Sequence, residues 1–228
     1  MASDGESLAR AAGAAAALEL VEAGMLLGLG SGRAVWALTD AVGARWPGLR
    51  VVVASEITGL RARTAGLEVR ELDGEVRLDL ALDGADEIGP RLGLIKGGGA
   101  ALLREKLVVE AAARFVVVAE EAKCVARLGE RWALPVEVVR FAWADTRRRL
   151  LELVPEAVLR LDDARATLVT DEGHLLLDCT LPPDGDVAAL GAAIKATTGV
   201  VEHGLFLGMA DLALLGRPDG TVAELGPS

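Results

Sequence analysis

Hydrophobic positions along the first half of the chain alternate between the two spacings typical of helices and strands. A periodic apolar stretch begins at Asp4 or Ser7 and ends near Ala23, and it predicts a first helix that stops at Gly24. The further expected elements are strands at 25–30, 50–54, 67–72 and 115–119 and helices at 33–45 and 56–65. Strands that alternate with helices in this order predict a mostly parallel sheet with right-handed crossovers.

The segment 76–82 has the alternation of a strand that is buried on one face. Leu78, Leu80 and Leu82 are expected to share one face of this strand. A turn-rich segment at 83–99 with six glycines follows, and after it a helix is expected over 100–113.

The pattern changes near residue 131, which indicates an inserted unit. A strand is expected at 135–139, a helix at 145–153, a hairpin of 167–170 with 174–179, and a helix at 186–197. We therefore predict a Rossmann-like α/β main domain built from 1–130 and 204–228, with a strand at 211–215 that returns to its sheet. Residues 131–203 form the predicted small α+β insert, of the ferredoxin-like type.

Composition and charge narrow the class of partner. The 228 residues include 24 Lys and Arg against 34 Asp and Glu, for a net charge of −10. This charge argues against nucleic acid and against anionic membranes. Two histidines exclude a multi-histidine metal cluster, and Cys124 and Cys179 are expected to be free thiols. The acidic start at 1–6 is unlike a signal peptide, and Glu19 and Glu22 interrupt the apolar stretch at 11–30, so a cytoplasmic protein is expected.

Two glycine loops are candidates for binding an anion. Gly28–Arg33 lies between a strand and a helix, and Lys96–Gly99 opens another helix. Such loops expose backbone N–H groups at a helix N-terminus, which suits a phosphate or an oxyanion. The first loop is neither a nucleotide P-loop nor a Gly-x-Gly-x-x-Gly fingerprint, and taken alone it is equally compatible with a plain turn.

Carboxylates follow the strand at 76–82, where α/β folds place their ligands. Asp83–Glu87 holds three of them within five residues, and by itself it is also compatible with a solvated turn or, less well, a metal site. Glu105, between Arg104 and Lys106, is taken alone a surface helix residue about two turns into its helix. Lys123 lies at another strand end, where an exposed helix start is the simpler interpretation.

Taken together, these segments resemble the ribose-5-phosphate isomerases of the A type. The resemblance rests on Asp83–Glu87 (Asp-Gly-Ala-Asp-Glu) and on Lys96–Lys106 (Lys-Gly-Gly-Gly-Ala-Ala-Leu-Leu-Arg-Glu-Lys). It is supported by Leu134–Val138, Thr170–His174 and Gly199–Phe206, so that it covers nearly the whole chain. It implies interconversion of ribose 5-phosphate and ribulose 5-phosphate through an enediolate, without metal or other cofactor, on a small phosphorylated sugar.

The same resemblance implies roles for individual residues. Glu105 matches the general base, Asp83 and Asp86 match carboxylates around the sugar hydroxyls, and Lys96 matches a group that stabilises the oxyanion. The expected substrate-binding residues are Ser31, Gly32, Arg33, Ala34, Gly84, Ala85, Gly97, Gly98, Gly99 and Lys123. Lys96 and the helix N-terminus are expected to lower the pKa of Glu105, an effect that desolvation on substrate closure is able to offset.

One stretch departs from the family pattern. The family's first loop usually has Gly-Thr-Gly-Ser-Thr, where this chain has Gly30-Ser31-Gly32-Arg33-Ala34. A guanidinium and a methyl group replace two hydroxyls, which bears on phosphate affinity and on sugar preference. Two alternatives stay open: a non-catalytic sugar-phosphate-binding protein, and an enzyme of the related CoA-transferase scaffold with a glutamate nucleophile. A homodimer or homotetramer is expected from Leu- and Val-rich stretches late in the chain.

Overall fold

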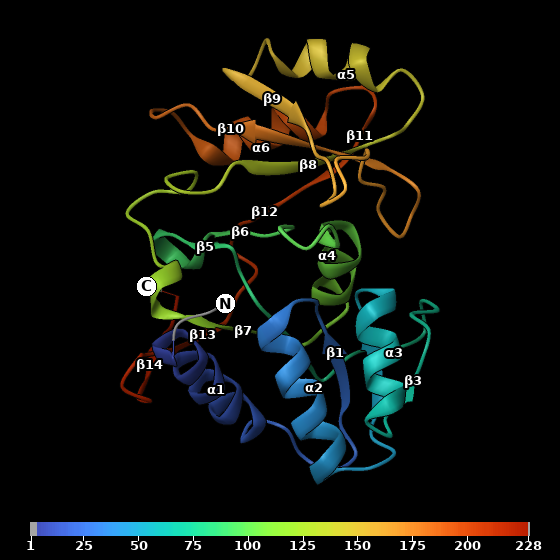
Figure 1. The fold of residues 1–228 in the computed structure, drawn as a ribbon, viewed down its shortest axis with the longest axis vertical. Coiled ribbons are helices and arrows are strands. Elements are labelled where there is room, and N and C mark those ends of the chain that lie inside the picture. The colour runs from blue at the N-terminus through green and yellow to red at the C-terminus, as the bar shows by residue number, and fades with distance from the viewer. Residues whose placement is uncertain (1–3, 228) are drawn as a thin grey trace.

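A seven-stranded sheet forms the centre of the computed structural model, which describes residues 4–227 (Figure 1). The first three residues of the acidic start lie outside the described residues. The strands of the seven-stranded sheet are β1 (Leu26–Leu29), β2 (Arg50–Val53), β3 (Glu68–Val69), β4 (Leu80–Asp83), β7 (Phe115–Glu120), β13 (Leu212–Gly216) and β14 (Val222–Leu225). They lie in the order β14-β13-β7-β4-β1-β2-β3, and only the β13–β14 pair is antiparallel. The predicted mostly parallel sheet is therefore confirmed.

Helices cover both faces of this sheet. On one face lie α1 (Asp4–Leu18) and α2 (Arg33–Arg45), in front of the sheet in Figure 1, with α3 (Glu56–Thr64) beside them. Leu38 of α2 packs there against strand residues such as Leu29. On the other face α4 (Leu102–Glu110) contributes Val108 to a second cluster that includes Val117. Because both faces are buried, the central strands β1, β4 and β7 are apolar along most of their length, as is typical of parallel strands.

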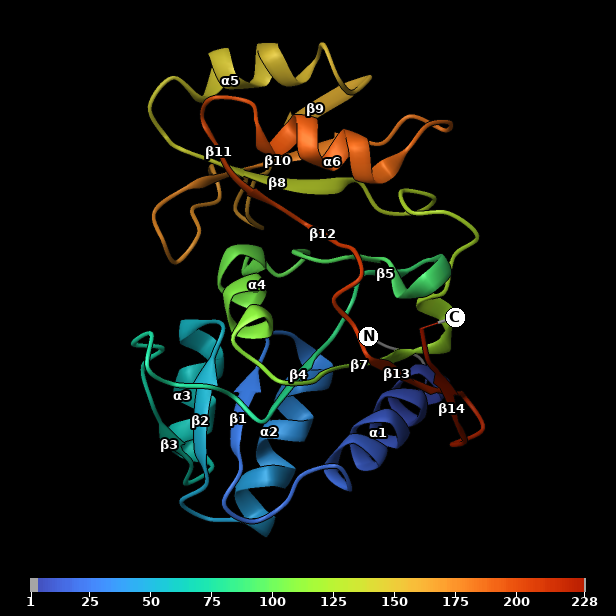
Figure 2. The same ribbon diagram turned by 180° about the vertical axis from the view of Figure 1, so that it is seen from behind.

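A short three-stranded antiparallel sheet lies above the second face. It consists of β5 (Glu87–Ile88), β6 (Leu94–Ile95) and β12 (Leu205–Phe206), in the order β12-β6-β5. Figure 2 shows it between the large sheet and the remaining part of the molecule. In sequence, the 3₁₀ turn Pro90–Leu92 lies between β5 and β6, and the 3₁₀ turn Glu121–Lys123 lies between β6 and β12. These two-residue strands lie in or after glycine-rich stretches and were not expected.

The remaining elements form an antiparallel sheet with two helices. They are β8 (Leu134–Val138), α5 (Trp143–Leu150), β9 (Glu156–Leu159), β10 (Leu175–Thr180), α6 (Val187–Lys195) and β11 (Val200–His203). The strand order β11-β8-β10-β9 and the chain order β-α-β-β-α-β make this unit ferredoxin-like, as expected. Its core is separate and includes Val136, Leu150 and Ile194. The domain boundaries at residues 131 and 203 stay a prediction.

Several expected elements are shorter than predicted, among them the strand 67–72, which is confined to Glu68–Val69, and the helix 100–113, which is confined to Leu102–Glu110. The first helix ends at Leu18 rather than near Ala23, because the chain turns inward and buries Val21 in the core, with Val21 N–H bonded to the Leu18 carbonyl at 3.2 Å. The expected strand 76–82 is confined to Leu80–Asp83. Leu78 forms only an isolated bridge and packs on the opposite face from Leu80 and Leu82, so the expected common face is wrong for Leu78.

The expected hairpin is also different. Residues 167–170 form isolated bridges rather than a strand, while β10 pairs with β8 on one side and with β9 on the other. The expected turn at 171–173 is present, with Gly173 at φ +79° and its N–H bonded to the Thr170 carbonyl. Among the described residues, no helix is both long and apolar enough to cross a membrane.

Candidate active site

A cavity of about 330 Å³ opens at the carboxyl ends of the central strands. Its lining comes from the start of α2, the loop after β4, the loop before α4 and the segment after β7. Every predicted site residue except Asp83 lines this cavity. Segments that are far apart in the sequence therefore meet at the sheet edge where α/β folds place their ligands.

Asp83 lies beneath the cavity floor, at the end of β4. One of its oxygens accepts hydrogen bonds from the N–H groups of Ser31 at 3.2 Å and Gly84 at 2.7 Å. Its other oxygen lies 2.7 Å from Nζ of Lys96. Gly30 makes this approach possible, because a Cβ at that position would lie 1.8 Å from the Asp83 carboxyl group.

Glu105 lies in the first turn of α4, where it is only 3% exposed. The two expectations for its surroundings are wrong: it is not a surface residue, and it is not two turns into the helix. The helix starts at Leu102 because Gly97 and Ala100, at φ +105° and +63°, hold the preceding loop in a non-helical conformation. Glu105 therefore reaches the cavity directly from the end of the glycine loop.

Lys96 lies between the two buried carboxylates. Its ammonium is 2.7 Å from Asp83 and 3.2 Å from Glu105, and it donates to the Gly84 carbonyl at 2.8 Å. Only the contact with the Gly84 carbonyl has hydrogen-bond geometry, and the contacts with the two carboxylates are ion pairs, because Asp83 Oδ2 and Glu105 Oε2 accept no hydrogen bond from the described residues. The ring of Phe206 lies 5.4 Å from the same nitrogen, a distance at which cation–π attraction contributes.

In this cluster a single ammonium group lies beside two carboxylates, and this arrangement, together with burial, shifts the pKa values of all three groups. Burial, and then the charge of Asp83, raise the pKa of Glu105 to about 8 against the opposing effect of Lys96. Burial likewise raises the pKa of Asp83. Burial works against the charge of Lys96, but the two carboxylates raise the Lys96 pKa above its ordinary value. The expected lowering of the Glu105 pKa is therefore wrong, because burial outweighs Lys96 before any substrate is bound.

Asp86 faces the glycine loop. Its Oδ2 accepts the Gly98 N–H at 2.7 Å, and a Cβ on Gly98 would lie 2.6 Å from its Oδ1, so a side chain at Gly98 would displace the Asp86 carboxylate. The third carboxylate of the motif, Glu87, points elsewhere and accepts the N–H groups of Gly129, Arg131 and Trp132. Asp83 and Asp86 of the acidic motif therefore lie at the site, whereas Glu87 holds a neighbouring loop.

The first glycine loop forms the opposite end of the cavity. Gly32, at φ +111°, precedes α2, and no side chain caps that helix start. The first N–H groups of α2 therefore remain available to an anion. Arg33 is exposed, lines the cavity and forms no ion pair with another described residue.

Sequence patterns did not indicate several residues that line the cavity. Arg10 of α1 and Glu120 at the end of β7 form an ion pair of 2.7 Å at its edge, although they are 110 positions apart in the chain. Trp132 lies 5.5 Å from Nζ of the predicted residue Lys123. No local pattern links such distant positions, so only the fold brings them together.

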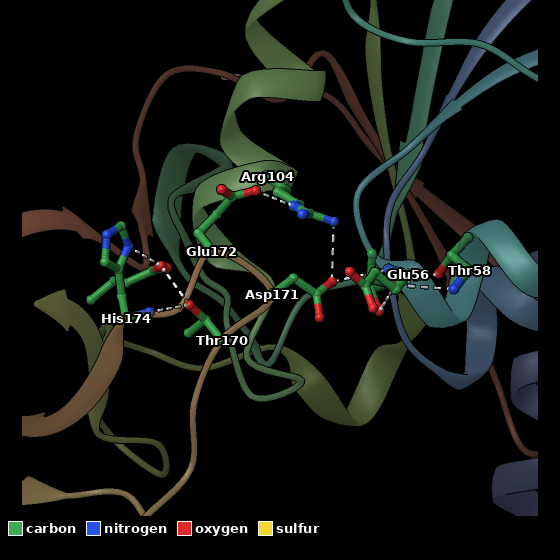
Figure 3. Close-up of polar contacts among 10 residues, drawn as sticks. Glu56, Thr58, Arg104, Thr170, Asp171, Glu172 and His174 are labelled. Carbon is green, nitrogen blue, oxygen red and sulfur yellow. Dashed lines mark hydrogen bonds and ion pairs between the residues drawn. The ribbon is translucent and has the colours of Figure 1, made fainter. Parts of the chain in front are cut away.

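The turn at 171–173 joins the four-stranded sheet of the ferredoxin-like unit (the small sheet) to α3 and α4, the two helices beside the site (Figure 3). Arg104, the neighbour of Glu105, is held by Glu172 at 2.6 Å and by Asp171 at 3.3 Å. The same Asp171 oxygen accepts the Glu56 N–H, at the start of α3, at 2.9 Å. The start of α4 is thereby tied to α3 and to the small sheet at one point.

Neither histidine lines the cavity. Nδ1 of His174 lies 2.9 Å from the buried Glu137 carboxylate, which also accepts the Thr170 hydroxyl (Figure 3). Burial, with the nearby charge of Lys106, lowers the pKa of His203 to about 4, so that it is neutral at pH 7. Cys124 and Cys179 are free thiols.

Comparison with known proteins gives consistent matches. Residues 50–220 match the family model of ribose 5-phosphate isomerase A (phosphoriboisomerase A). The ribose-5-phosphate isomerase A of Roseiflexus sp. (strain RS-1) is 50% identical over 98% of each chain. That of Caulobacter sp. (strain K31) is 50% identical over 91% of this chain and 93% of its own.

Solved structures agree with this result. The ribose 5-phosphate isomerase A of Methanocaldococcus jannaschii superposes with a TM-score of 0.88, at 34% identity over 97% of this chain and 99% of its own. A D-ribose-5-phosphate isomerase in complex with phospho-erythronic acid superposes with a TM-score of 0.90, at 30% identity over 97% and 98% of the two chains. With the family model matched and half of all positions identical over nearly the full length, the chain belongs to the ribose 5-phosphate isomerase A family.

Proposed function

We propose that Glu105 is the base with which this chain interconverts ribose 5-phosphate and ribulose 5-phosphate. The activity itself follows from membership of the family. The observation that supports the role of Glu105 is its position: a buried carboxylate with a pKa of about 8, on the wall of a cavity that also holds Asp86 and Lys96. A carboxylate with a raised pKa is a stronger base toward carbon than an exposed one.

In the proposed reaction the open-chain sugar lies between the two glycine loops. The phosphate binds at the start of α2, against Ser31, Gly32, Arg33 and Ala34. Glu105 removes the proton from C2 of the aldose, and the electron pair moves toward the carbonyl oxygen to form an enediolate. Asp86 holds a hydroxyl of the sugar, and the proton of the O2 hydroxyl passes to O1, so that O1 becomes the hydroxyl and O2 carries the negative charge. Glu105 then returns its proton to C1, which completes the ketose.

Lys96 and Asp83 support this step from beneath the cavity. When Glu105 is ionised, the ammonium of Lys96 lies 3.2 Å from its carboxylate and offsets its charge. When Glu105 has taken up the substrate's proton, the ammonium becomes available to the negative oxygen of the enediolate. The charge of Lys96 thus stabilises the negative charge first on the base and then on the intermediate, as electrostatic stabilisation of a transition state requires.

The direct test is an assay of the purified chain with ribose 5-phosphate, in buffer with EDTA. We expect ribulose 5-phosphate to form at a rate that EDTA does not change, because the proposed reaction uses only side chains. Binding of the sugar phosphate without turnover would favour the non-catalytic alternative and would overturn the proposal.

The raised pKa of Glu105 predicts the pH dependence of the reaction. Glu105 acts as a base only when it is ionised, so kcat/KM should rise about tenfold per pH unit below pH 8 and level off above it. The substrate phosphate titrates near pH 6, well below this inflection. A rate profile measured from pH 5.5 to 9.5 tests this. A profile that is already level at pH 6 would contradict the prediction.

Arg33 is expected to bind the phosphate rather than to take part in the proton transfer. The variant R33A should raise KM for ribose 5-phosphate about tenfold, the value of roughly one charged hydrogen bond, and leave kcat nearly unchanged. Initial rates over a range of substrate concentrations give both constants. Arg127, which is also exposed but does not line the cavity, offers a matched control in R127A. An unchanged KM in R33A would show that its side chain does not reach the phosphate.

Oligomeric state and location in the cell stay predictions. A homodimer or homotetramer is supported by large apolar side chains on the surface, such as Ile57, Leu60 and Phe141, which are 63%, 69% and 88% exposed. Light scattering of the purified chain measures the mass of the assembly, and a monomer would overturn this prediction. The expected cytoplasmic location rests on the sequence alone.

A further inference from the structure

One arginine of the small sheet reaches the glycine loop of the candidate site. Arg160 directly follows β9, and its Nη1 donates to the Gly97 carbonyl at 2.7 Å and more weakly to the Gly98 carbonyl at 3.3 Å. These are two successive peptide groups of the loop between Lys96 and α4. Arg160 does not line the cavity itself, so its effect on a ligand must pass through the loop.

The guanidinium of Arg160 is firmly held. It forms a two-pronged ion pair with Asp178 of β10, with Nε at 2.9 Å from Oδ2 and Nη2 bonded to Oδ1. The backbone N–H of Arg160 also bonds to the Leu176 carbonyl of the same strand at 2.9 Å. The side chain is only 12% exposed. A planar fork fixed by a carboxylate presents its remaining N–H groups in set directions.

Fixing a carbonyl also fixes the next N–H, because the peptide group is planar and the two bonds of a trans peptide point in opposite directions. The Gly97 carbonyl points to Arg160, and the Gly98 N–H of the same peptide group points to Asp86 at 2.7 Å. The next peptide group follows the same rule: the Gly98 carbonyl turns toward Arg160, so the Gly99 N–H turns away from it.

The Gly99 N–H has no acceptor among the described residues. Gly99 lines the cavity, and nothing lies within 4 Å of the position that a Cβ would occupy there. A free N–H on the lining of a polar cavity is a donor for an oxygen of a ligand. The positive charge of Arg160 on the opposite side of the peptide group also polarises it and strengthens that donor.

We infer that Arg160 is a positioning residue that holds the Gly97–Gly99 peptides so that the Gly99 N–H binds an oxygen of the sugar-phosphate substrate. The inference rests on the proposed function, and it adds a residue from the small sheet to a site that otherwise belongs to the main sheet. It also gives the small sheet a role in substrate binding.

The variant R160M removes the donor, and R147M is its matched control. Arg147 is also an arginine of the small unit and also donates to a backbone carbonyl, that of Ala157 at 2.6 Å, but it does not touch the loop. We expect R160M to raise KM for ribose 5-phosphate about tenfold, with kcat changed less than about threefold. The Kd of phospho-erythronic acid, measured by calorimetry, should rise by the same factor. R147M should change neither constant.

A purely structural role for Arg160 predicts a different pattern. R160M would then have a lower melting temperature and a smaller fraction of active molecules, which lowers the apparent kcat. The KM and Kd of the folded molecules would stay at the wild-type values. That pattern would overturn the inference. If R160M does not fold, R160K keeps a positive charge beside Asp178 but lacks the planar fork, and its KM and Kd should still rise. Unchanged constants in R160K would overturn the inference equally.

The same measurements separate this inference from the proposed function. Wild-type protein that converts no ribose 5-phosphate would overturn the function whatever the Arg160 variants do. Wild-type activity together with unchanged KM and Kd in R160M would overturn the role of Arg160 and leave the function standing.

Discussion

E105Q is expected to lower kcat for ribose 5-phosphate about 10³-fold and to leave KM within about threefold of the wild-type value. Glutamine keeps the size of the side chain and an oxygen that can face Lys96, but it cannot accept a proton from C2. Glu105 is buried and adjoins the cavity, so no other group takes its place without rearrangement. Initial-rate kinetics at pH 8.5, where wild-type Glu105 is mostly ionised, give the largest contrast.

The matched control is E110Q, at the exposed end of the same helix, which should keep full activity. Calorimetry with phospho-erythronic acid shows whether the E105Q site is intact. If E105Q binds this anion like the wild type and still turns over at more than a tenth of the wild-type rate, Glu105 is not the base.

K96M is expected to lower kcat/KM at pH 7 by about 10³-fold or more. Two effects combine, because the loss of the ammonium removes an electrostatic stabiliser worth about 10²–10³ in rate and also raises the pKa of Glu105 further above 8. Among the described residues, Lys96 is the only cation paired with these two buried carboxylates, so its removal also costs stability, of the order of 3–5 kcal/mol when both are charged.

The stability loss in K96M should depend on pH in a defined direction. Burial raises the folded-state pKa of both Asp83 and Glu105 above the unfolded values. At pH values between the unfolded-state and folded-state pKa, the folded state therefore binds more protons than the unfolded state. Stability is therefore retained at low pH and lost as pH rises, and the variant should melt closer to the wild type at pH 5 than at pH 8.5. Equal deficits at both pH values would contradict this account.

K106M provides the control for K96M. Lys106 is also buried, forms an ion pair with Glu202 at 2.7 Å and lies 4.8 Å from the ring of Phe206, yet it does not line the cavity. Its loss should lower the melting temperature but leave kcat/KM of the folded protein unchanged. The pair of variants thus separates the role of a buried ammonium in the fold from its role in the reaction.

The strands and helices of the main sheet were predictable because their signals are local. The apolar runs of β1, β2 and β7 and the glycines before α2 and α4 mark those elements without knowledge of their neighbours. Where side chains from distant positions decide the outcome, prediction failed: Leu78 alternates correctly with Leu80 in sequence but lies on the other face. The loop before α4 is another case, because Ala100 adopts a positive φ that local propensity disfavours.

The residue types of the site were predictable, but its electrostatics were not. The motifs identified Glu105 and Lys96, and a single cation near a carboxylate indicated a lowered pKa. The burial that reverses this result comes from the folded surroundings of the start of α4, where Glu105 is almost completely covered. Arg160 was missed because it lies 63 positions from Gly97 and has no motif around it.

Exchange of hydrogen with solvent tests the role of Glu105 most directly. In D₂O, a carboxyl group that has taken the C2 proton exchanges it and returns deuterium to carbon. Wild-type protein should therefore introduce deuterium at C2 of ribose 5-phosphate and at C1 of ribulose 5-phosphate, as followed by proton NMR. E105Q, with its affinity for phospho-erythronic acid intact, should do so about 10³-fold more slowly. Deuterium incorporation by E105Q at the wild-type rate would contradict the assignment of Glu105 as the base.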